Sequence, residues 1–264
     1  MIDNPRSPRV RAVAKLAKRS AREETGLFLV EGPQAVSEAL EFRGAALVDL
    51  FMTRSALDRY GDLARSAAAS GVDAEEVSDH VLETMADTVT PQGVVAVARQ
   101  FPISVKEMLA GGVTLVAILD EVRDPGNAGT IIRAADAAGA DGVILTGKSV
   151  DAYNPKVVRS TTGSLFHIAV AQGLELDAAI RAVKRAGLQV LAADIAGDDL
   201  PTVRDRLDRP TAWLFGNEAH GLTDESLGFA DAVVKVPIYG RAESLNLATA
   251  ASVCLYESAF AQRG

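Results

Sequence analysis

The second half of the chain alternates six short apolar runs with longer segments that have the spacing of helices. A parallel β-sheet covered by helices on both faces buries each strand on both sides, so its strands are apolar almost throughout. The pattern therefore predicts an α/β domain with a mostly parallel sheet. The predicted strands cover residues 114–119, 142–146, 167–171, 189–195, 211–216 and 231–238.

The first hundred residues alternate in the same way, but less regularly. Strand patterns cover residues 27–32, 46–53 and 93–101, and helical patterns cover residues 33–42, 56–70 and 80–87. A polar, glycine-containing stretch at residues 101–113 separates this region from the second half. We therefore expect two domains, a small α/β domain over residues 1–105 and a larger one over residues 112–264.

Composition limits the class of protein. A hydrophobic content of 48% with 23% charged residues is typical of a soluble enzyme, and no apolar stretch approaches the ~20 residues of a membrane span. The N-terminus has no apolar segment of the secretory type, and a single cysteine, Cys254, fits a reducing compartment. We expect a cytoplasmic protein with no membrane partner. His80, His167 and His220 are scattered along the chain, so no metal site is expected.

The charge is distributed unevenly. The chain carries a net charge of −8, yet residues 1–22 hold seven basic side chains against Asp3 alone, which leaves −14 for the remainder. A basic arm on an acidic body can contact phosphates locally, although a solvated helix face has the same composition. Both can hold if an apolar stripe of Val10, Val13, Leu16 and Ala17 docks the helix. The outward candidates for RNA contact are Arg9, Arg11 and Lys15.

Three polar blocks follow predicted strands of the second half. They are DPGNAGTIIRAAD (124–136), FGNEAHGL (215–222) and VPIYGRAESLNLATAA (236–251). The carboxyl ends of parallel strands share one edge of a sheet, so these blocks predict a single composite ligand site. Asn127 is expected to cap the helix of the first block, and residues 244–246 are expected to enter the helix of the third.

In this order and at this spacing, the blocks resemble the signature motifs of the TrmH/SpoU RNA ribose 2′-O-methyltransferases, within the SPOUT superfamily. The resemblance covers roughly residues 113–262 and is weaker in the first hundred. It implies a trefoil-knotted SPOUT domain preceded by an L30e-like RNA-binding domain. It also implies a homodimer that uses S-adenosylmethionine to methylate a ribose 2′-hydroxyl, with 23S ribosomal RNA as the expected substrate and tRNA as the alternative.

The resemblance also implies roles for individual residues. The residues implied at the catalytic centre are Asn127, Arg133, Glu218, Ser244 and Asn246. Those implied at the S-adenosylmethionine site are Leu214, Gly216, Asn217, Val236, Ile238 and Leu245. In the family, the arginine matching Arg133 has been assigned to activate the 2′-hydroxyl. A guanidinium with a pKa above ~12 is a poor base, so we expect it to hold a phosphate and stabilise the developing alkoxide.

Other interpretations of the sequence remain open at this point. The helical pattern at residues 154–166 offers Arg159 as a fourth RNA contact, or as part of an ordinary exposed helix face. Residues 142–149, GVILTGKS, match the phosphate-binding pattern G-x-x-x-x-G-K-[ST], but apolar strand residues occupy the supposed loop and no helix follows. We therefore expect a chance match. An RNA-binding protein with a degenerate methyltransferase domain is the non-enzyme alternative. The methylated nucleotide stays open, as does a resistance role of the thiostrepton or avilamycin type.

Overall fold

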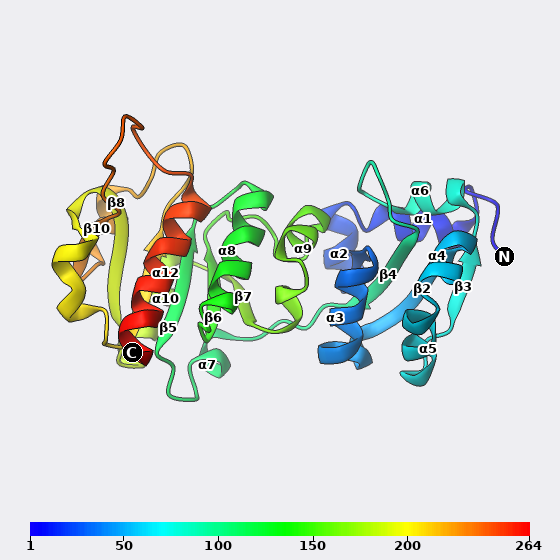
Figure 1. Ribbon diagram of the computed structural model, residues 1–264, viewed down its shortest axis with the longest axis horizontal. Helices are drawn as coiled ribbons and strands as arrows, with labels where there is room; N and C mark the ends of the chain where they lie inside the picture. The colour runs from blue at the N-terminus through cyan, green and yellow to red at the C-terminus, as the bar shows by residue number, and fades with distance from the viewer. The chain divides into compact units, whose positions relative to one another are not determined.

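The computed structural model describes residues 1–264, which form two compact units (Figure 1). Unit 1 comprises Met1–Phe101 and Tyr153–His167, and unit 2 comprises Pro102–Ala152 and Ile168–Gly264. The segment Tyr153–His167 therefore packs within unit 1, although its sequence position falls inside the predicted range 112–264. None of the helices has both the length and the hydropathy that a membrane span requires.

Unit 1 contains a mixed four-stranded sheet in the order β1-β4-β2-β3. Strands β1 and β2 run antiparallel to β4, and β3 runs parallel to β2. Strand β3 was not predicted, because its sequence AEEV has two adjacent carboxylates and no alternation of apolar and polar residues. The bounds are β1 Leu27–Glu31, β2 Leu47–Thr53, β3 Ala74–Val77 and β4 Val94–Arg99.

The helices of unit 1 follow the predicted pattern with three breaks, and the first comes after Lys15, where the basic helix ends before Leu16 and Ala17 of the expected stripe. The helix predicted at residues 56–70 is interrupted at Tyr60, and the one predicted at residues 154–166 ends at Thr162, which has a φ of 53°. On α1, Val10 and Val13 are buried as expected. The helices are α1 Pro8–Lys15, α2 Arg19–Thr25, α3 Pro33–Arg43, α4 Arg54–Arg59, α5 Gly61–Ala69, α6 Asp79–Met85 and α9 Pro155–Thr161, with short 3₁₀ turns η1 Gly44–Ala46 and η2 Ser164–Phe166.

Unit 2 contains a six-stranded sheet in the order β10-β8-β9-β5-β6-β7, in which every pairing is parallel. The predicted fold class is confirmed. Its strands are β5 Leu115–Asp120, β6 Gly142–Thr146, β7 Ala169–Leu174, β8 Gln189–Asp199, β9 Thr211–Phe215 and β10 Ala232–Lys235. Its helices are α7 Val105–Met108, α8 Pro125–Ala137, α10 Leu176–Arg185, α11 Asp224–Gly228 and α12 Leu247–Arg263, with the 3₁₀ turn η3 Leu200–Arg206.

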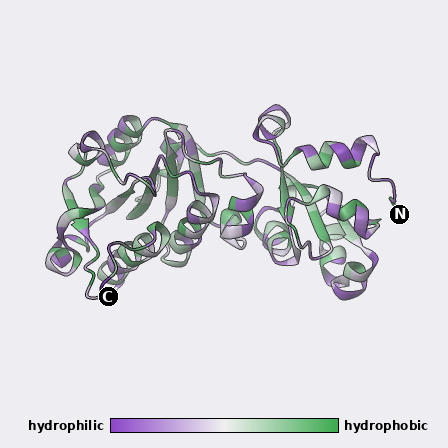
Figure 2. Ribbon diagram, turned by 90° about the horizontal axis from the view of Figure 1, so that it is seen from above, coloured by the Kyte–Doolittle hydropathy of each residue, from purple (hydrophilic) through white to green (hydrophobic).

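The strands of unit 2 are hydrophobic along most of their length (Figure 2). Side chains on one face, such as Ile118, pack with Ile180 of α10, while α8 and α12 pack together against the opposite face. There the indole Nε1 of Trp213 on β9 donates a hydrogen bond to Ser258 Oγ on α12, at 2.9 Å, and both side chains are buried. This contact holds α12 against β9, a central strand of the sheet.

The carboxyl ends of the central strands lie side by side. Leu119 of β5 pairs with Phe215 of β9, and Asp120 pairs with Thr146 of β6. The segments that leave these strands therefore begin at one edge of the sheet. The chain also returns to α12 from the outer strand β10 through residues 236–246, which form the projecting orange loop in Figure 1. The trefoil knot that the resemblance implies stays a prediction.

Candidate active site at the carboxyl ends of β5 and β9

Glu218 joins the first and second polar blocks. It follows β9, and its two carboxylate oxygens accept hydrogen bonds from the backbone N of Arg123 (3.3 Å) and of Asp124 (3.0 Å). The side-chain Nδ2 of Asn127 donates to the same carboxylate at 3.3 Å. A single acidic side chain thus holds the start of α8 against the loop that follows β9.

Asn246 joins the third block to the same network. Its Nδ2 donates to Asn127 Oδ1 at 3.0 Å, and its Oδ1 accepts from the backbone N of Ala248 (2.9 Å) and of Thr249 (3.2 Å) at the start of α12. A carboxylate only accepts hydrogen bonds, so both amides must be oriented as described. Asn127, Glu218 and Asn246, which lie far apart in the sequence, therefore form one continuous hydrogen-bond network.

The prediction that Asn127 caps α8 is wrong. The N-cap is Asp124, whose Oδ1 accepts from the backbone N of Asn127 at 2.7 Å, and Pro125 occupies the first helical position. Aspartate before proline is a strong helix start, since it supplies the acceptor while proline lacks the donor. The side chain of Asn127 is consequently available for the network.

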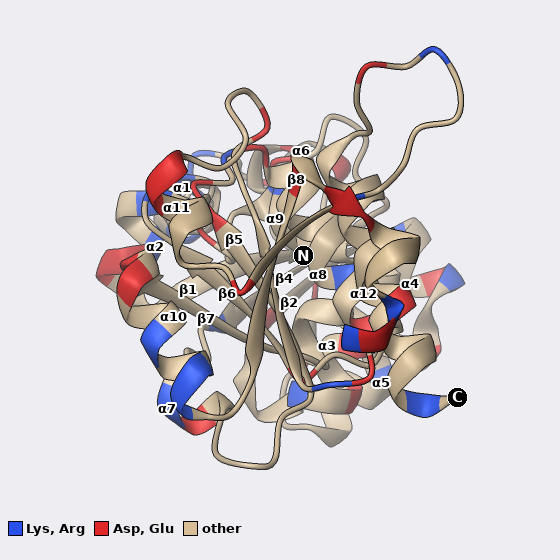
Figure 3. Ribbon diagram, turned by 90° about the vertical axis from the view of Figure 1, so that its left-hand side faces the viewer, with Lys and Arg blue, Asp and Glu red and all other residues tan.

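Residues 236–245 expose an unpaired backbone. Between Lys235, the last residue of β10, and the N-cap Asn246, no main-chain or side-chain group of this loop makes a hydrogen bond within the chain. The loop projects from the sheet and carries both acidic and basic positions (Figure 3). Ile238 is half-buried, and Leu245 is 39% exposed. Free amide and carbonyl groups beside apolar side chains suit a purine and an amino-acid moiety, so this loop fits S-adenosylmethionine.

The other predicted cofactor residues shape the neighbouring loop. The side chain of Leu214 lies in the core, and its backbone pairs with β5 on one side and with β8 on the other. A Cβ at Gly216 would overlap the backbone of Gly221, which explains the glycine there. Asn217 exchanges two backbone hydrogen bonds with Gly221, and its Nδ2 donates to the carbonyl O of Glu121 at 2.7 Å. These residues close a tight turn that presents Glu218 to the network.

The chain matches the SpoU rRNA Methylase family over residues 114–256 and the MRM3-like substrate binding domain over residues 7–96. The chain belongs to the SpoU rRNA methylase family. The resemblance inferred from the three blocks is confirmed, and with it the SPOUT type of sheet.

Relatives in this family match nearly the whole chain. The 23S rRNA (guanosine(2553)-2′-O)-methyltransferase RlmP of Bacillus subtilis is 33% identical over 97% of both chains. The 23S rRNA (uridine(2479)-2′-O)-methyltransferase of Streptomyces viridochromogenes is 33% identical over 93% of this chain and 86% of its own. The AdoMet-bound rRNA methyltransferase of Sinorhizobium meliloti superposes with a TM-score of 0.83 at 33% identity, covering 97% of this chain and 96% of that chain.

Two predicted catalytic residues of this SpoU chain lie outside the network. Arg133 is exposed on α8, six residues and about 9 Å along the helix from Asn127, and it has no polar partner in the chain. Ser244 is exposed in the loop before α12 and likewise makes no hydrogen bond. A single chain therefore brings together three of the five predicted catalytic residues.

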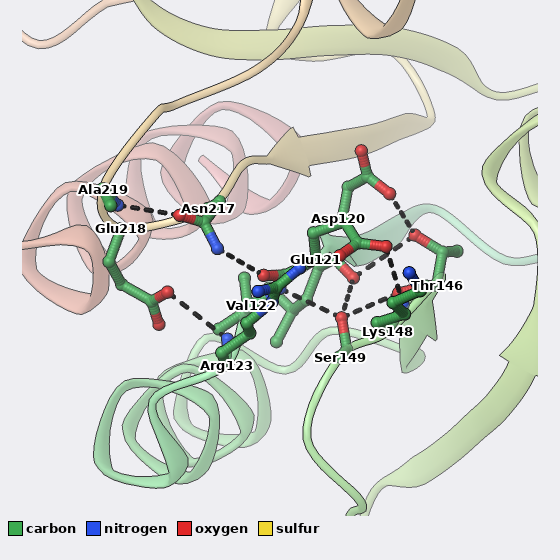
Figure 4. Close-up of polar contacts among 11 residues, drawn as sticks. Asp120, Glu121, Val122, Arg123, Thr146, Lys148, Ser149, Asn217, Glu218 and Ala219 are labelled. Carbon is green, nitrogen blue, oxygen red and sulfur yellow. Dashed lines mark hydrogen bonds and ion pairs between the residues drawn. The ribbon is translucent and has the colours of Figure 1, made fainter.

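Glu121, the residue directly after β5, is a further polar residue of this site that was not predicted (Figure 4). Its carboxylate accepts from the guanidinium of Arg123 and from the backbone N of Lys148, each at 2.8 Å. These hydrogen bonds, the one from Arg123 foremost, lower the pKa of Glu121. Glu121 and Arg123 also line a hollow of about 470 Å³ whose other wall is the loop Asn217–Gly221. The available signal was an acidic residue at the end of an apolar strand, next to a polar block.

The phosphate-loop interpretation of GVILTGKS is excluded. Residues 142–146 form strand β6 inside the supposed loop, and the next helix begins only at Pro155. A phosphate-binding loop of this type requires a helix to start at the Lys-Ser pair. The expectation of a chance match is confirmed.

The four predicted RNA contacts fall into two groups. Arg9 forms ion pairs with Asp49 and Glu75, and Arg159 pairs with Glu31 at 2.6 Å and Asp87 at 2.9 Å. Burial opposes the charged form of Arg9, but its hydrogen bonds and the two carboxylates raise its pKa. By contrast, Arg11 and Lys15 are exposed on α1 and have no ion pair. Only these two are free of internal partners.

Proposed function

We propose that this protein transfers a methyl group from S-adenosylmethionine to a ribose 2′-hydroxyl of RNA, with 23S ribosomal RNA as its substrate. The observation that carries the proposal is the network of Glu218, Asn127 and Asn246, which unites the three blocks at one edge of the sheet. The relatives named as 23S rRNA 2′-O-methyltransferases support the choice of substrate. A ribosomal RNA substrate also places the proposed reaction in the cytoplasm.

The network has open hydrogen-bonding capacity for a substrate. An amide side chain carries two N–H groups, and Asn127 and Asn246 each use one within the chain. The remaining N–H groups can donate to a ribose oxygen and stabilise the negative charge that develops there. S-adenosylmethionine supplies a methyl group that its positive sulfur has already activated, so these residues need only align and stabilise the reactants.

Glu218 serves as an anchor for the network in this proposal. Its carboxylate receives three N–H donors, two of them from the backbone at the start of α8. These bonds hold Asn127 at a fixed distance from the loop that follows β9. The proposed role of the carboxylate is therefore to orient Asn127, and the proton of the 2′-hydroxyl leaves to water or to another group.

A homodimer would supply the missing arginine. Arg133 is exposed without a polar partner, and α12 exposes an apolar row of Val253, Tyr256 and Phe260 at helical spacing. An exposed apolar row on a helix of the catalytic unit suits a subunit interface. We assign Arg133 and Ser244 to a site completed by two subunits, in which Arg133 holds a phosphate of the RNA.

We assign substrate binding to the N-terminal domain, residues 1–105, and methyl transfer to residues 112–264. The match of residues 7–96 to a substrate-binding domain supports this division. Arg11 and Lys15, on the outward side of α1, are the proposed phosphate contacts of the N-terminal domain.

The test is methyl transfer from radiolabelled S-adenosylmethionine to total RNA from cells that lack the gene. We expect label in 23S RNA at one 2′-O-methylated nucleotide, which mapping of alkali-resistant positions will identify. Label in tRNA alone would support the tRNA alternative, and methylation of a base would contradict the proposal. Binding of the methyl donor and of RNA without any transfer would favour an RNA-binding protein.

A further inference from the structure

Glu121 has an unfavourable backbone conformation. It follows β5 with a φ of 54°, in the left-handed region that side chains disfavour. The side-chain Nδ2 of Asn217 bonds its carbonyl O at 2.7 Å and stabilises this conformation. Unfavourable backbone at the edge of a site persists only where its neighbours hold it, so the side chain of Glu121 is directed by the surrounding structure.

Residues 147–149, the Gly-Lys-Ser end of the GVILTGKS match, contact Glu121 and the residue after it. A Cβ at Gly147 would overlap Glu121 Oε1, so the glycine makes room for the carboxylate. The backbone N of Lys148 donates to Oε1 at 2.8 Å, and Ser149 Oγ accepts from the backbone N of Val122 at 3.0 Å (Figure 4). The Gly-Lys-Ser turn therefore fixes the segment between β5 and the network.

Glu121, fixed in this way, holds the exposed guanidinium of Arg123. This guanidinium donates to Glu121 Oε2 at 2.8 Å, while the side chain of Arg123 is 64% exposed and lines the hollow beside Glu218. Only one guanidinium nitrogen bonds to Glu121, so most of the five N–H donors are free. Lys148 is also exposed, so Arg123 and Lys148 place two cations at this edge, beside the carboxylates of Asp120, Glu121, Asp124 and Glu218.

We propose that Arg123 contacts a backbone phosphate of the RNA beside the nucleotide that is methylated, and that Glu121 is the positioning residue that orients its guanidinium. The proposal rests on the proposed function and deepens it. The backbone N of Arg123 bonds to Glu218, so the phosphate lies within one side-chain length of the network. A planar guanidinium binds phosphate through two parallel hydrogen bonds, which fixes the register of the RNA as well as its affinity.

The experiment compares Arg123→Gln, Arg123→Lys and a matched control, Arg181→Gln, in the full-length protein. Arg181 is similarly exposed (60%) in the same unit and also pairs with one carboxylate, Asp177. Measurements are kcat/KM for RNA, direct RNA binding against salt concentration, and binding of S-adenosylmethionine. Arg123→Gln is expected to lower kcat/KM for RNA about tenfold or more and to reduce the salt slope by ~0.7, with cofactor binding unchanged. Arg123→Lys should restore the slope but only part of the rate.

Glu121 is tested in a double-mutant cycle. Glu121→Gln removes the charge, and Glu121→Gly removes the carboxylate while tolerating the left-handed backbone. If Glu121 positions Arg123, both variants lower kcat/KM about threefold to tenfold in the wild-type background and have no effect in the Arg123→Gln background. A gain in RNA binding in both backgrounds would mean that Glu121 acts only by repulsion, and would overturn its positioning role.

The outcomes separate this inference from the proposed function. If the wild type methylates a ribose and Arg123→Gln behaves like Arg181→Gln, the phosphate contact is overturned while the function stands. If the wild type binds RNA without methylating it, the function fails, and the salt slopes still decide whether Arg123 meets a phosphate. A wild-type protein that binds no RNA overturns both.

Discussion

In unit 1, Arg9 and Arg159 each contact two carboxylates, whereas in unit 2 Arg123 contacts one and Arg133 contacts none. The asparagine side chains that cap helices in the two units also differ in the contacts they make. Asn154 in unit 1 caps α9, whereas Asn246 in unit 2 caps α12 and also extends into the network. Polar groups whose hydrogen-bonding partners all lie within the chain stabilise the fold. Polar groups that have unused donors or acceptors are available to ligands. The comparison therefore marks Arg123 and Arg133 as candidates for ligand contact in unit 2, as exposure without an ion pair marks Arg11 and Lys15 in unit 1.

The largest effect is expected from Asn246→Asp. Aspartate caps a helix as well as asparagine does, so α12 stays intact, but a carboxylate cannot donate to Asn127 Oδ1. We expect methyl transfer to fall by about 10²–10³, because the alignment of Asn127 and one donor to the ribose oxygen are lost. The control is Asn154→Asp, which changes the cap of α9 alone. Activity within threefold of wild type for Asn246→Asp would contradict the functional role of the network.

Much of the sheet and of the network in unit 2 could be predicted from sequence, because local patterns carry local structure. Strand β6 was predicted over residues 142–146 with the bounds it has, since a run of β-forming apolar residues ends at a glycine. Asn127, Glu218 and Asn246 were named from motifs, and parallel strand ends explain why they meet. The cap at Asp124 was missed because Asp and Asn are comparable capping residues and the sequence offers both within one turn.

Long-range pairing could not be predicted in the same way. Tyr153 and Phe166 pack with Phe28 in unit 1, at ring-centroid distances of 4.8 Å and 6.4 Å, although more than 120 residues separate them from it. The hydrophobic pattern of residues 153–167 does not indicate that they pack against Phe28. The same reason hid the ion pairs of Arg159, since Glu31 and Asp87 lie far away in the sequence. Charge counting cannot distinguish an arginine that is neutralised in the fold from one that is free.

Mixing two inactive variants tests whether Arg133 contributes to the active site of the partner subunit. Arg133→Ala and Asn246→Ala are each expected to be inactive as homodimers. If a site takes Arg133 from one subunit and Asn246 from the other, a mixed dimer keeps one intact site. Equal mixing and exchange of subunits should then restore about a quarter of wild-type activity. No recovery, with light scattering confirming that dimers exchange, would place both residues in the same chain's site.

Arg159→Met should lower stability more than activity. The substitution leaves the carboxylate of Glu31, whose side chain is 3% exposed, without its cation. Breaking a buried ion pair costs about 3 kcal/mol, and we expect that loss in the unfolding of unit 1 by urea. The double variant Glu31→Gln with Arg159→Met should regain much of it, since no unpaired charge remains. Weaker RNA binding at unchanged stability would instead show that Arg159 contacts RNA, and would contradict the structural role assigned to this ion-paired arginine.

The smallest effect concerns the basic arm, where the comparison assigns different roles to neighbouring arginines of one helix. Arg11→Gln and Lys15→Gln remove exposed cations without internal partners, and each should weaken RNA binding a few-fold and reduce the salt slope by ~0.7. Arg9→Gln removes a cation held by Asp49 and Glu75 over the ring of Phe51, so thermal stability should fall instead. Binding isotherms at several salt concentrations, together with melting curves, distinguish the two effects. An Arg9 variant that lost RNA affinity as Arg11→Gln does, at an unchanged melting temperature, would show that ion-paired arginines in unit 1 still reach the phosphate backbone.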